Sequence, residues 1–246
     1  PGRMPRLARA IVPGLPHHLT QRGNRRQQTF FRTDDYLLYL ALMGYWCRKC
    51  SVEIWAYCLM PNHAHLIAVP STAEGLREAI AQAHRRYTWE INQRQGWRGC
   101  LWQGRFASYV MDERYTLAAA RYIELNPVRA RLVPGPADYV WSSARAHLSG
   151  RDDALVTVAP LLALAGNWED FLRTAVDASI AKELRGNETT GRPLGSDAFI
   201  DDLEKALGRV LRPRRPGPPP HGVPQEEGAT LARGVALCVP DLRLTS

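Results

Sequence analysis

The 246-residue sequence has little of what marks several other classes of protein. It holds no apolar run near the roughly 18–20 residues that a membrane-spanning helix needs. Its five cysteines are too few for a fold stapled by disulfides, and no apolar stretch follows the first arginines as in a signal peptide. No internal repeat, phosphate-binding loop or Rossmann glycine pattern is present. We therefore expect a cytoplasmic protein that does not act at a membrane.

Lysine is also scarce, because 29 of the 32 basic residues are arginine. GC-rich coding favours arginine whatever the function, but it does not account for the net charge of +8. Residues 1–150 carry 20 basic and 10 acidic side chains, whereas residues 151–246 carry 12 and 14. The whole positive excess thus lies in the first 150 residues, which predicts a polyanionic partner such as nucleic acid.

Hydrophobic periodicity predicts an alternation of strands and helices in the first half of the chain. Strands are expected over residues 15–21, 52–60, 63–69 and 105–111, with a hairpin turn at Pro61 and Asn62. Helices are expected from Thr33 onward, over 72–95 and over 112–126. This order predicts an α+β fold, in which helices pack on one or both faces of a single sheet with antiparallel strands.

The character of the chain changes after Trp141. Residues 154–186 and 196–211 have the pattern of helices, and the proline-rich run from Pro213 suits neither helix nor sheet. We therefore expect three parts: a main domain over residues 4–150, a helical auxiliary region over 151–211, and a disordered basic tail over 212–246.

The sharpest local feature is a pair of histidines, His63 and His65, at the start of a predicted strand. Side chains alternate along a strand, so these two imidazoles project from the same face. Such a pair can hold a metal ion, although two histidines on a strand are more often core residues with hydrogen bonds. Of the adjacent His17 and His18, at most one can approach the same centre, since neighbours in a strand point to opposite faces.

A second feature is Tyr122, which lies four residues before Asn126 in a predicted helix. Residues at this spacing share a helix face. Taken alone, Tyr122 would be an ordinary half-buried tyrosine, and Asn126 would cap a new helix beginning at Pro127. Tyr115 lies about 10 Å earlier on a similar face, so we expect it to be structural.

Together these features resemble the HUH-type single-strand tyrosine transposases, and more closely their REP-associated branch. The resemblance covers residues 4–150, where the motifs occur in the family's order. The matching stretches run from His17 to Asn24, from Ala56 to Leu66, from Trp102 to Phe106, from Tyr122 to Ala130, and from Trp141 to Ser143.

The resemblance implies a ferredoxin-like sheet, and it implies roles for residues at matching positions. His63 and His65 would be metal ligands, Asn126 a third ligand, and Tyr122 the nucleophile. The expected cofactor is a divalent ion, Mg²⁺ or Mn²⁺, and mixed nitrogen and oxygen ligands favour Mn²⁺. The implied reaction is cleavage and rejoining of single-stranded DNA through a 5′-phosphotyrosine, on hairpin-forming repeats, by a monomer.

Single-stranded DNA is bound by basic grooves and by stacking on aromatic rings. The side chains that we expect to contact DNA are Arg22, Arg25, Arg26, Arg85, Arg86, Trp102, Arg105 and Phe106, together with Trp97.

Two other functions are alternatives to the transferase. One is a DNA-binding regulator without catalysis, and the other is a metal hydrolase in which water attacks and Tyr122 is structural. A covalent protein–DNA adduct would distinguish the transferase from both.

Overall fold

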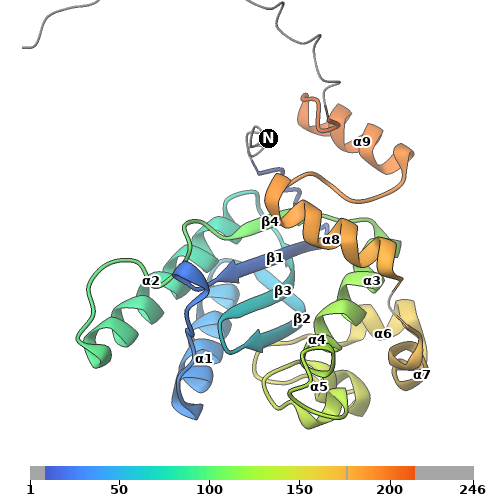
Figure 1. Ribbon diagram of the computed structural model, residues 1–246. Coiled ribbons are helices and arrows are strands. Elements are labelled where there is room, and N and C mark those ends of the chain that lie inside the picture. Colours follow the sequence, from blue (N-terminus) through green and yellow to red (C-terminus); the bar gives the residue numbers. More distant parts are fainter. Residues whose placement is uncertain (1–8, 176, 214–246) are drawn as a thin grey trace, which may run out of the picture. The chain divides into compact units, whose positions relative to one another are not determined.

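The computed structural model describes residues 9–175 and 177–213, so the expected tail over 212–246 lies almost wholly outside the described residues. Four strands form one sheet, and helices cover both of its faces (Figure 1). The strands are β1 (His17–Arg22), β2 (Val52–Met60), β3 (His63–Pro70) and β4 (Ala107–Val110). Up to residue 150 the helices are α1 (Thr33–Lys49), α2 (Gly75–Gln95), α3 (Glu113–Glu124), α4 (Asn126–Arg129) and α5 (Ala144–Ser149), with short turns η1 (Asn24–Arg26) and η2 (Pro136–Asp138).

The order of strands in the sheet is β2-β3-β1-β4, and every neighbouring pair is antiparallel. Helix α1 connects β1 to β2, and α2 connects β3 to β4, so each connection passes over one intervening strand. This is the ferredoxin-like arrangement, and the predicted α+β fold is confirmed. The last strand is shorter than predicted, because residues 105 and 106 precede it without pairing.

Helices α1 and α2 pack together against one face of the sheet, and this layer holds the larger core. Leu66 and Ala68 of β3 point into it with Ile54 of β2. Its centre is aromatic, with the rings of Phe30, Tyr39 and Tyr87 at centroid distances of 5.2 to 5.5 Å. These side chains are fully buried, so packed rings fill the layer between the sheet and helices α1 and α2.

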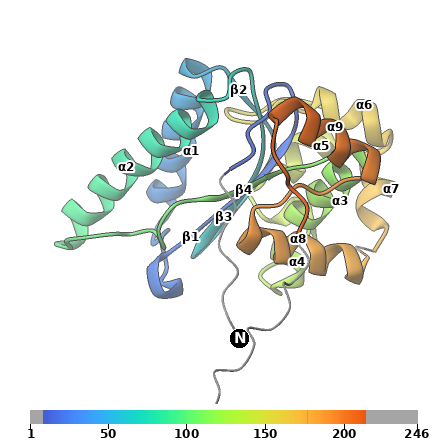
Figure 2. The ribbon, with the colours of Figure 1, turned by 90° about the horizontal axis from the view of Figure 1, so that it is seen from above.

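The opposite face of the sheet is covered by α3 and by the later helix α8 (Ala178–Thr190). Figure 2 shows α1 and α2 on one side of the strands and α3 and α8 on the other. Ile67 of β3, Cys58 of β2 and Tyr109 of β4 point toward α3, whose residues Ala119 and Ile123 complete this second core. Strand alternation therefore places His63 and His65 on the α3 face, in step with Ile67.

A buried carboxylate at the C-terminal end of helix α3 links this helix to its neighbours by hydrogen bonds. Glu124 is fully buried, and its Oε1 accepts hydrogen bonds from Ser143 Oγ at 2.5 Å and His147 Nδ1 at 2.7 Å. Its Oε2 accepts from Trp168 Nε1 at 2.8 Å, and Ser143 Oγ also accepts from the Tyr57 backbone of β2 at 3.0 Å. The carboxylate thus ties the end of α3 to the sheet and to the chain beyond residue 140.

The region after residue 150 is helical, but residues 154–186 do not form the continuous helix that the pattern suggested. Gly166 has a positive φ of 70° after the first helix, and the chain extends again at Thr174. No described helix has the length and apolar character to cross a membrane. The elements in this region are α6 (Ala159–Ala165), α7 (Trp168–Arg173), α8 and α9 (Asp197–Leu207).

Candidate active site

The two histidines of β3 meet on the α3 face, as their alternation predicts. Their ring centroids are 4.9 Å apart and the rings are nearly perpendicular. His65 is 1% exposed, whereas His63 at the start of the strand is half-buried. The pair therefore sits at the edge between core and solvent, where a substrate can reach one ring while the other is held by the protein.

Tyr122 lies near the end of α3, and Asn126 begins α4, because α3 ends at Glu124 rather than at the predicted residue 126; each of the two side chains approaches one of these rings. The Tyr122 ring lies 5.9 Å from the ring of His65 and perpendicular to it. The Asn126 amide Nδ2 lies 3.5 Å from His63 Nε2, and a half-turn of the amide brings its oxygen there instead. The four residues that the sequence singles out thus converge on one place.

The orientation of His63 leaves one ring nitrogen available. Asn62 donates its amide hydrogen to the carbonyl of Arg26 at 3.1 Å, so its Oδ1 faces the other way. This oxygen accepts a hydrogen bond from His63 Nδ1 at 2.6 Å. A neutral imidazole carries one hydrogen, so the lone pair of His63 is at Nε2, on the side of Asn126.

Both rings are neutral at physiological pH. Burial lowers the pKa of His63 to about 4, and the nearby Arg22 adds to the shift. Burial also lowers the pKa of His65 well below its usual value, and the positive charges of Arg22 and Arg129 act in the same direction. The neutral ring is the form in which histidine binds a metal ion. The donor set of two imidazoles and an amide therefore fits a divalent ion.

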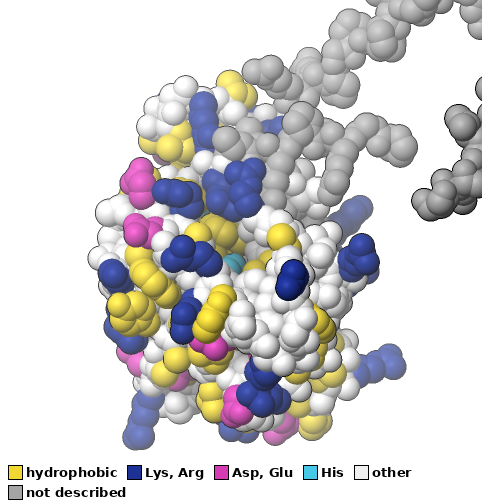
Figure 3. All heavy atoms as spheres, turned by 90° about the vertical axis from the view of Figure 1, so that its left-hand side faces the viewer, with side chains coloured by type: hydrophobic (Ala, Val, Ile, Leu, Met, Phe, Trp, Pro, Cys, Tyr) yellow, Lys and Arg dark blue, Asp and Glu magenta, His cyan; other side chains and the backbone are white. Residues whose placement is uncertain are grey.

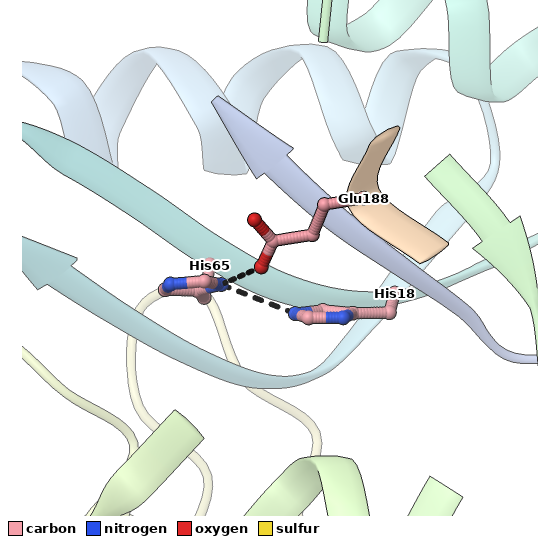
Figure 4. A group of neighbouring side chains, drawn as sticks. All are labelled: His18, His65 and Glu188. Carbon is pink, nitrogen blue, oxygen red and sulfur yellow. Dashed lines mark hydrogen bonds and ion pairs between the residues drawn. The ribbon is translucent and has the colours of Figure 1, made fainter. Parts of the chain in front are cut away.

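A further group of ligand atoms lies beside His65 (Figure 4). His18 of β1, His65 of β3 and Glu188 of α8 bring one ligand atom each to within 4.8 Å of one another, and these distances allow the three to hold a metal ion. The His18 Nε2 atom is 3.1 Å from His65 Nδ1, and the Glu188 carboxylate is 3.9 Å from the same nitrogen. Burial raises the pKa of Glu188.

Two arginines, Arg22 and Arg129, lie beside the histidines and Tyr122. The Arg129 guanidinium lies 4.1 Å from the centre of the Tyr122 ring and shares a hydrogen bond with that side chain, and burial lowers the pKa of Arg129. Arg22 pairs with His63 across the β1–β3 ladder. Figure 3 shows a histidine near the middle of one face, among apolar side chains and with arginine and lysine side chains around it. Such a setting suits a phosphate group.

The other arginines expected to bind DNA lie on exposed positions near this centre or on α2. Arg25 and Arg26 project from η1, directly after β1, with positive φ angles of 53° and 62°. Arg85 and Arg86 are exposed on α2, and Arg86 lies 4.4 Å from the centre of the Trp89 ring. Arg105 is exposed in the loop before β4. Each of these stays an expectation for DNA contact.

The aromatic residues in the expected set differ in exposure. Trp102 is 7% exposed and Phe106 is 6% exposed, because Trp102 packs on Tyr87 and His84 and Phe106 lies under Arg9. As placed, neither ring offers an open face to a base. Trp97 is 42% exposed, so it is the one of the three whose position suits stacking.

Of the adjacent His17 and His18, only His18 reaches the centre, as expected of neighbours in a strand, whereas His17 bonds to the Leu15 carbonyl. Three other residues of the centre were not identified from the sequence. Thr20 lies two residues after His18 in β1, and the same period-two rule that found the histidine pair would place both on one face. Arg129 lies in the stretch from Tyr122 to Ala130 that matches the family, but the resemblance assigns it no role. Glu188 had no signal at all, because it lies more than a hundred residues from β3 in a helix of ordinary composition. The Tyr115 hydroxyl donates to Glu183 at 2.5 Å, and a structural role for Tyr115 stays a prediction.

Comparison with known proteins agrees with the motifs. Residues 12–126 match the model of the IS200-like transposase family, and this match confirms the resemblance predicted from the sequence. No curated protein matches the chain. A REP-associated tyrosine transposase bound to a REP hairpin is similar at 22% identity, over 63% of this chain and 92% of that chain, with a TM-score of 0.49. A crystal structure from Deinococcus radiodurans R1, provisionally assigned as a transposase, is similar at 20% identity over 48% and 95%, with a TM-score of 0.35.

Proposed function

We propose that this chain, whose residues 12–126 match the IS200-like transposase family, cleaves and rejoins single-stranded DNA with Tyr122 as its nucleophile. The observation that carries the proposal is the meeting of Tyr122 with two neutral histidines and an amide on one face of the sheet. A DNA-binding regulator has no need of this combination. The same geometry also supports dependence on a divalent metal ion.

His63 and His65 would hold the ion through their imidazoles, with Asn126 as an oxygen ligand. Mixed nitrogen and oxygen ligands favour Mn²⁺ over Mg²⁺, and we expect both ions to support the reaction. When bound, the ion supplies positive charge to a non-bridging oxygen of the phosphodiester.

Tyr122 would attack the phosphorus with its hydroxyl oxygen. A tyrosine–phosphate bond forms, the bond from phosphorus to the 3′-oxygen breaks, the tyrosine proton leaves to solvent, and the 3′-oxygen takes up a proton. One phosphoester replaces another, so the step is reversible and needs no nucleotide cofactor. Arg129 would orient the Tyr122 ring and add charge beside the phosphate, since it already contacts that ring.

The proposed substrate is a hairpin-forming repeat with a single-stranded flank, as the family resemblance implies. The charge of the first 150 residues, the half-buried Arg22 of β1 and the exposed arginines of η1 and α2 support a DNA partner. We assign the chemistry to residues 4–150 and a supporting role to the helical region over 151–211. The expected monomer stays a prediction that sedimentation would check.

The proposal is tested by a covalent adduct. The full chain is incubated with Mn²⁺ and a labelled pool of hairpin-forming single strands, then separated under denaturing conditions. The wild type and Tyr115→Phe should form a labelled band, and Tyr122→Phe should form none while binding DNA as before. Cleavage without an adduct would favour the hydrolase, and binding without cleavage would favour the regulator.

A further inference from the structure

A chain of buried hydrogen bonds leads from helix α8 to His65. The Tyr109 hydroxyl of β4 donates to the carbonyl of Leu184 in α8 at 2.9 Å. The same hydroxyl oxygen lies 2.5 Å from His18 Nδ1, and His18 Nε2 lies 3.1 Å from His65 Nδ1. Tyr109, His18 and His65 are each no more than 1% exposed. The cleavage chemistry described above makes no use of Tyr109 or His18.

The Leu184 carbonyl, at one end of this series of hydrogen bonds, determines the direction of each bond in it. A backbone carbonyl can only accept, so the single hydrogen of the Tyr109 hydroxyl points to Leu184. Tyr109 must then accept the hydrogen of His18 Nδ1. His18 is fully buried, and a neutral imidazole carries one hydrogen, so with that hydrogen on Nδ1 its Nε2 carries a lone pair. That lone pair accepts a hydrogen from His65 Nδ1.

The chain therefore determines which nitrogen of His65 can bind a metal ion. A neutral ring with its hydrogen on Nδ1 has its lone pair on Nε2. In Figure 4 the second ring nitrogen of His65 points away from His18 and Glu188. His63 also has its lone pair at Nε2, as its bond to Asn62 requires. The two histidines thus present matching nitrogens.

We propose that His18 is a positioning residue, which with Tyr109 and Glu188 holds His65 in the tautomer and orientation that the metal site needs. The inference rests on the proposed function, because it takes His63 and His65 as the ligands. Glu188 contributes its negative charge 3.9 Å from His65 Nδ1, and Thr20 adds a hydroxyl contact at 3.2 Å to the same atom. Carboxylates behind a metal-bound histidine raise its strength as a ligand.

The same atoms permit a rival arrangement, with the ion held by His18, His65 and Glu188. The two arrangements exclude each other, because a neutral His65 has one lone pair. An ion beside Glu188 would use that lone pair at Nδ1 and place the hydrogen on Nε2. The hydrogen-bond chain from Leu184 favours the first arrangement, since it supplies an acceptor for His65 Nδ1 without any ion.

The first test measures Mn²⁺ affinity of the full chain by electron paramagnetic resonance, so it does not depend on cleavage. His18→Leu should weaken affinity by about 10- to 100-fold, the usual cost of losing such a supporting contact. His18→Gln restores an acceptor near His65 and should recover most of it, and Glu188→Gln should weaken it to a smaller extent. His84→Leu is the matched control, because His84 is buried on the far face of the sheet and should leave affinity unchanged.

Each remaining outcome has one meaning. If His63→Ala abolishes Mn²⁺ binding while His18→Leu leaves it unchanged, the inference is wrong and the proposed function stands. If His18→Leu and Glu188→Gln abolish binding while His63→Ala does not, the ion lies in the rival cluster and the inference is overturned. If the Mn²⁺ affinities are as expected but the wild type forms no covalent adduct, the proposed function is wrong.

A second measurement keeps the test independent of how well a variant folds. Long-range ¹H–¹⁵N correlation spectra of the metal-free wild type report which nitrogen of each histidine carries the hydrogen. The inference requires the hydrogen of His65 and of His18 on Nδ1. A spectrum with the His65 hydrogen on Nε2 would overturn it.

Discussion

Replacing Glu124 with glutamine tests how firmly the nucleophile-bearing helix is held. Glu124 is two residues after Tyr122, and it is fully buried with three hydrogen-bond donors around it. Glutamine keeps the shape of the side chain but replaces one carboxylate oxygen with an NH₂ group. The change therefore isolates the charge and one acceptor from the packing.

The size of the effect follows from the three contacts. In its best orientation the new amide keeps its oxygen toward Ser143 and His147 and turns its nitrogen toward Trp168. The Trp168 N–H then faces another donor, and a bond to a charged acceptor contributes about 1.5–3 kcal/mol. The other two bonds weaken because the acceptor is neutral. We expect a total loss of about 2–4 kcal/mol, a large share of the ~5–15 kcal/mol that usually stabilises a domain.

Urea unfolding followed by circular dichroism measures this loss. Glu124→Gln should lower the midpoint by about 1 M for a domain of this size. Glu169→Gln, the same change at an exposed carboxylate paired with Arg173, should cost at most about 1 kcal/mol. Equal effects of the two substitutions would refute the reasoning, because the buried network would then contribute no more than a surface ion pair.

Three more predictions follow. Burial lowers the pKa of His18 and of His84 to about 3, so the unfolded chain binds protons in a pH range where the folded chain does not. The free energy of unfolding should therefore fall as the pH drops from about 6.5 toward 4, by up to about 1.4 kcal/mol per pH unit for each ring. Urea titrations at several pH values measure this fall. Asn126→Ala should weaken Mn²⁺ affinity by less than about tenfold, since water can replace an amide ligand, and a greater loss than in His63→Ala would contradict this. Arg22→Gln should reduce the slope of DNA affinity against salt by about one, in binding titrations from low to high salt; an unchanged slope would remove Arg22 from the DNA contact.

Much of the fold could be predicted from the sequence because its signals are local. The β2–β3 hairpin is marked by alternation on both sides of Pro61 and Asn62, and Asp112 caps α3 through the Tyr115 backbone N–H as its type suggests. The boundaries of the helices after residue 150 are harder to predict from the sequence. Gly166 interrupts an apolar stretch there, and periodicity alone does not say whether a helix continues past such a glycine.

The residues of the candidate site also fall into those that local patterns predict and those that they do not. His63, His65, Tyr122 and Asn126 are close in pairs along the chain, so the periods of strand and helix place them correctly relative to each other. The contact between His18 and His65 depends on the register of β1 against β3, which the sequence does not specify without the sheet. Glu188 depends on how α8 packs on the sheet, and no local pattern encodes this.

Burial divides the residues that were expected to contact DNA into two groups. Trp102 and Phe106 lie next to exposed loop residues in the sequence, and a tryptophan in such a loop can equally well fold inward or outward. Trp102 turns inward because Tyr87 and His84 form an aromatic pocket that it fills. An arginine such as Arg25 carries no comparable ambiguity, since its charge keeps it at the surface.

The central claim is that Tyr122 becomes joined to the 5′-phosphate of the cleaved strand. The most direct measurement is mass spectrometry of the covalent adduct after digestion with trypsin and nuclease. We expect the peptide containing Tyr122 to carry a phosphate on that tyrosine and the released strand to end in a 3′-hydroxyl. A phosphate on any other residue, or a released strand with a 3′-phosphate, would contradict it.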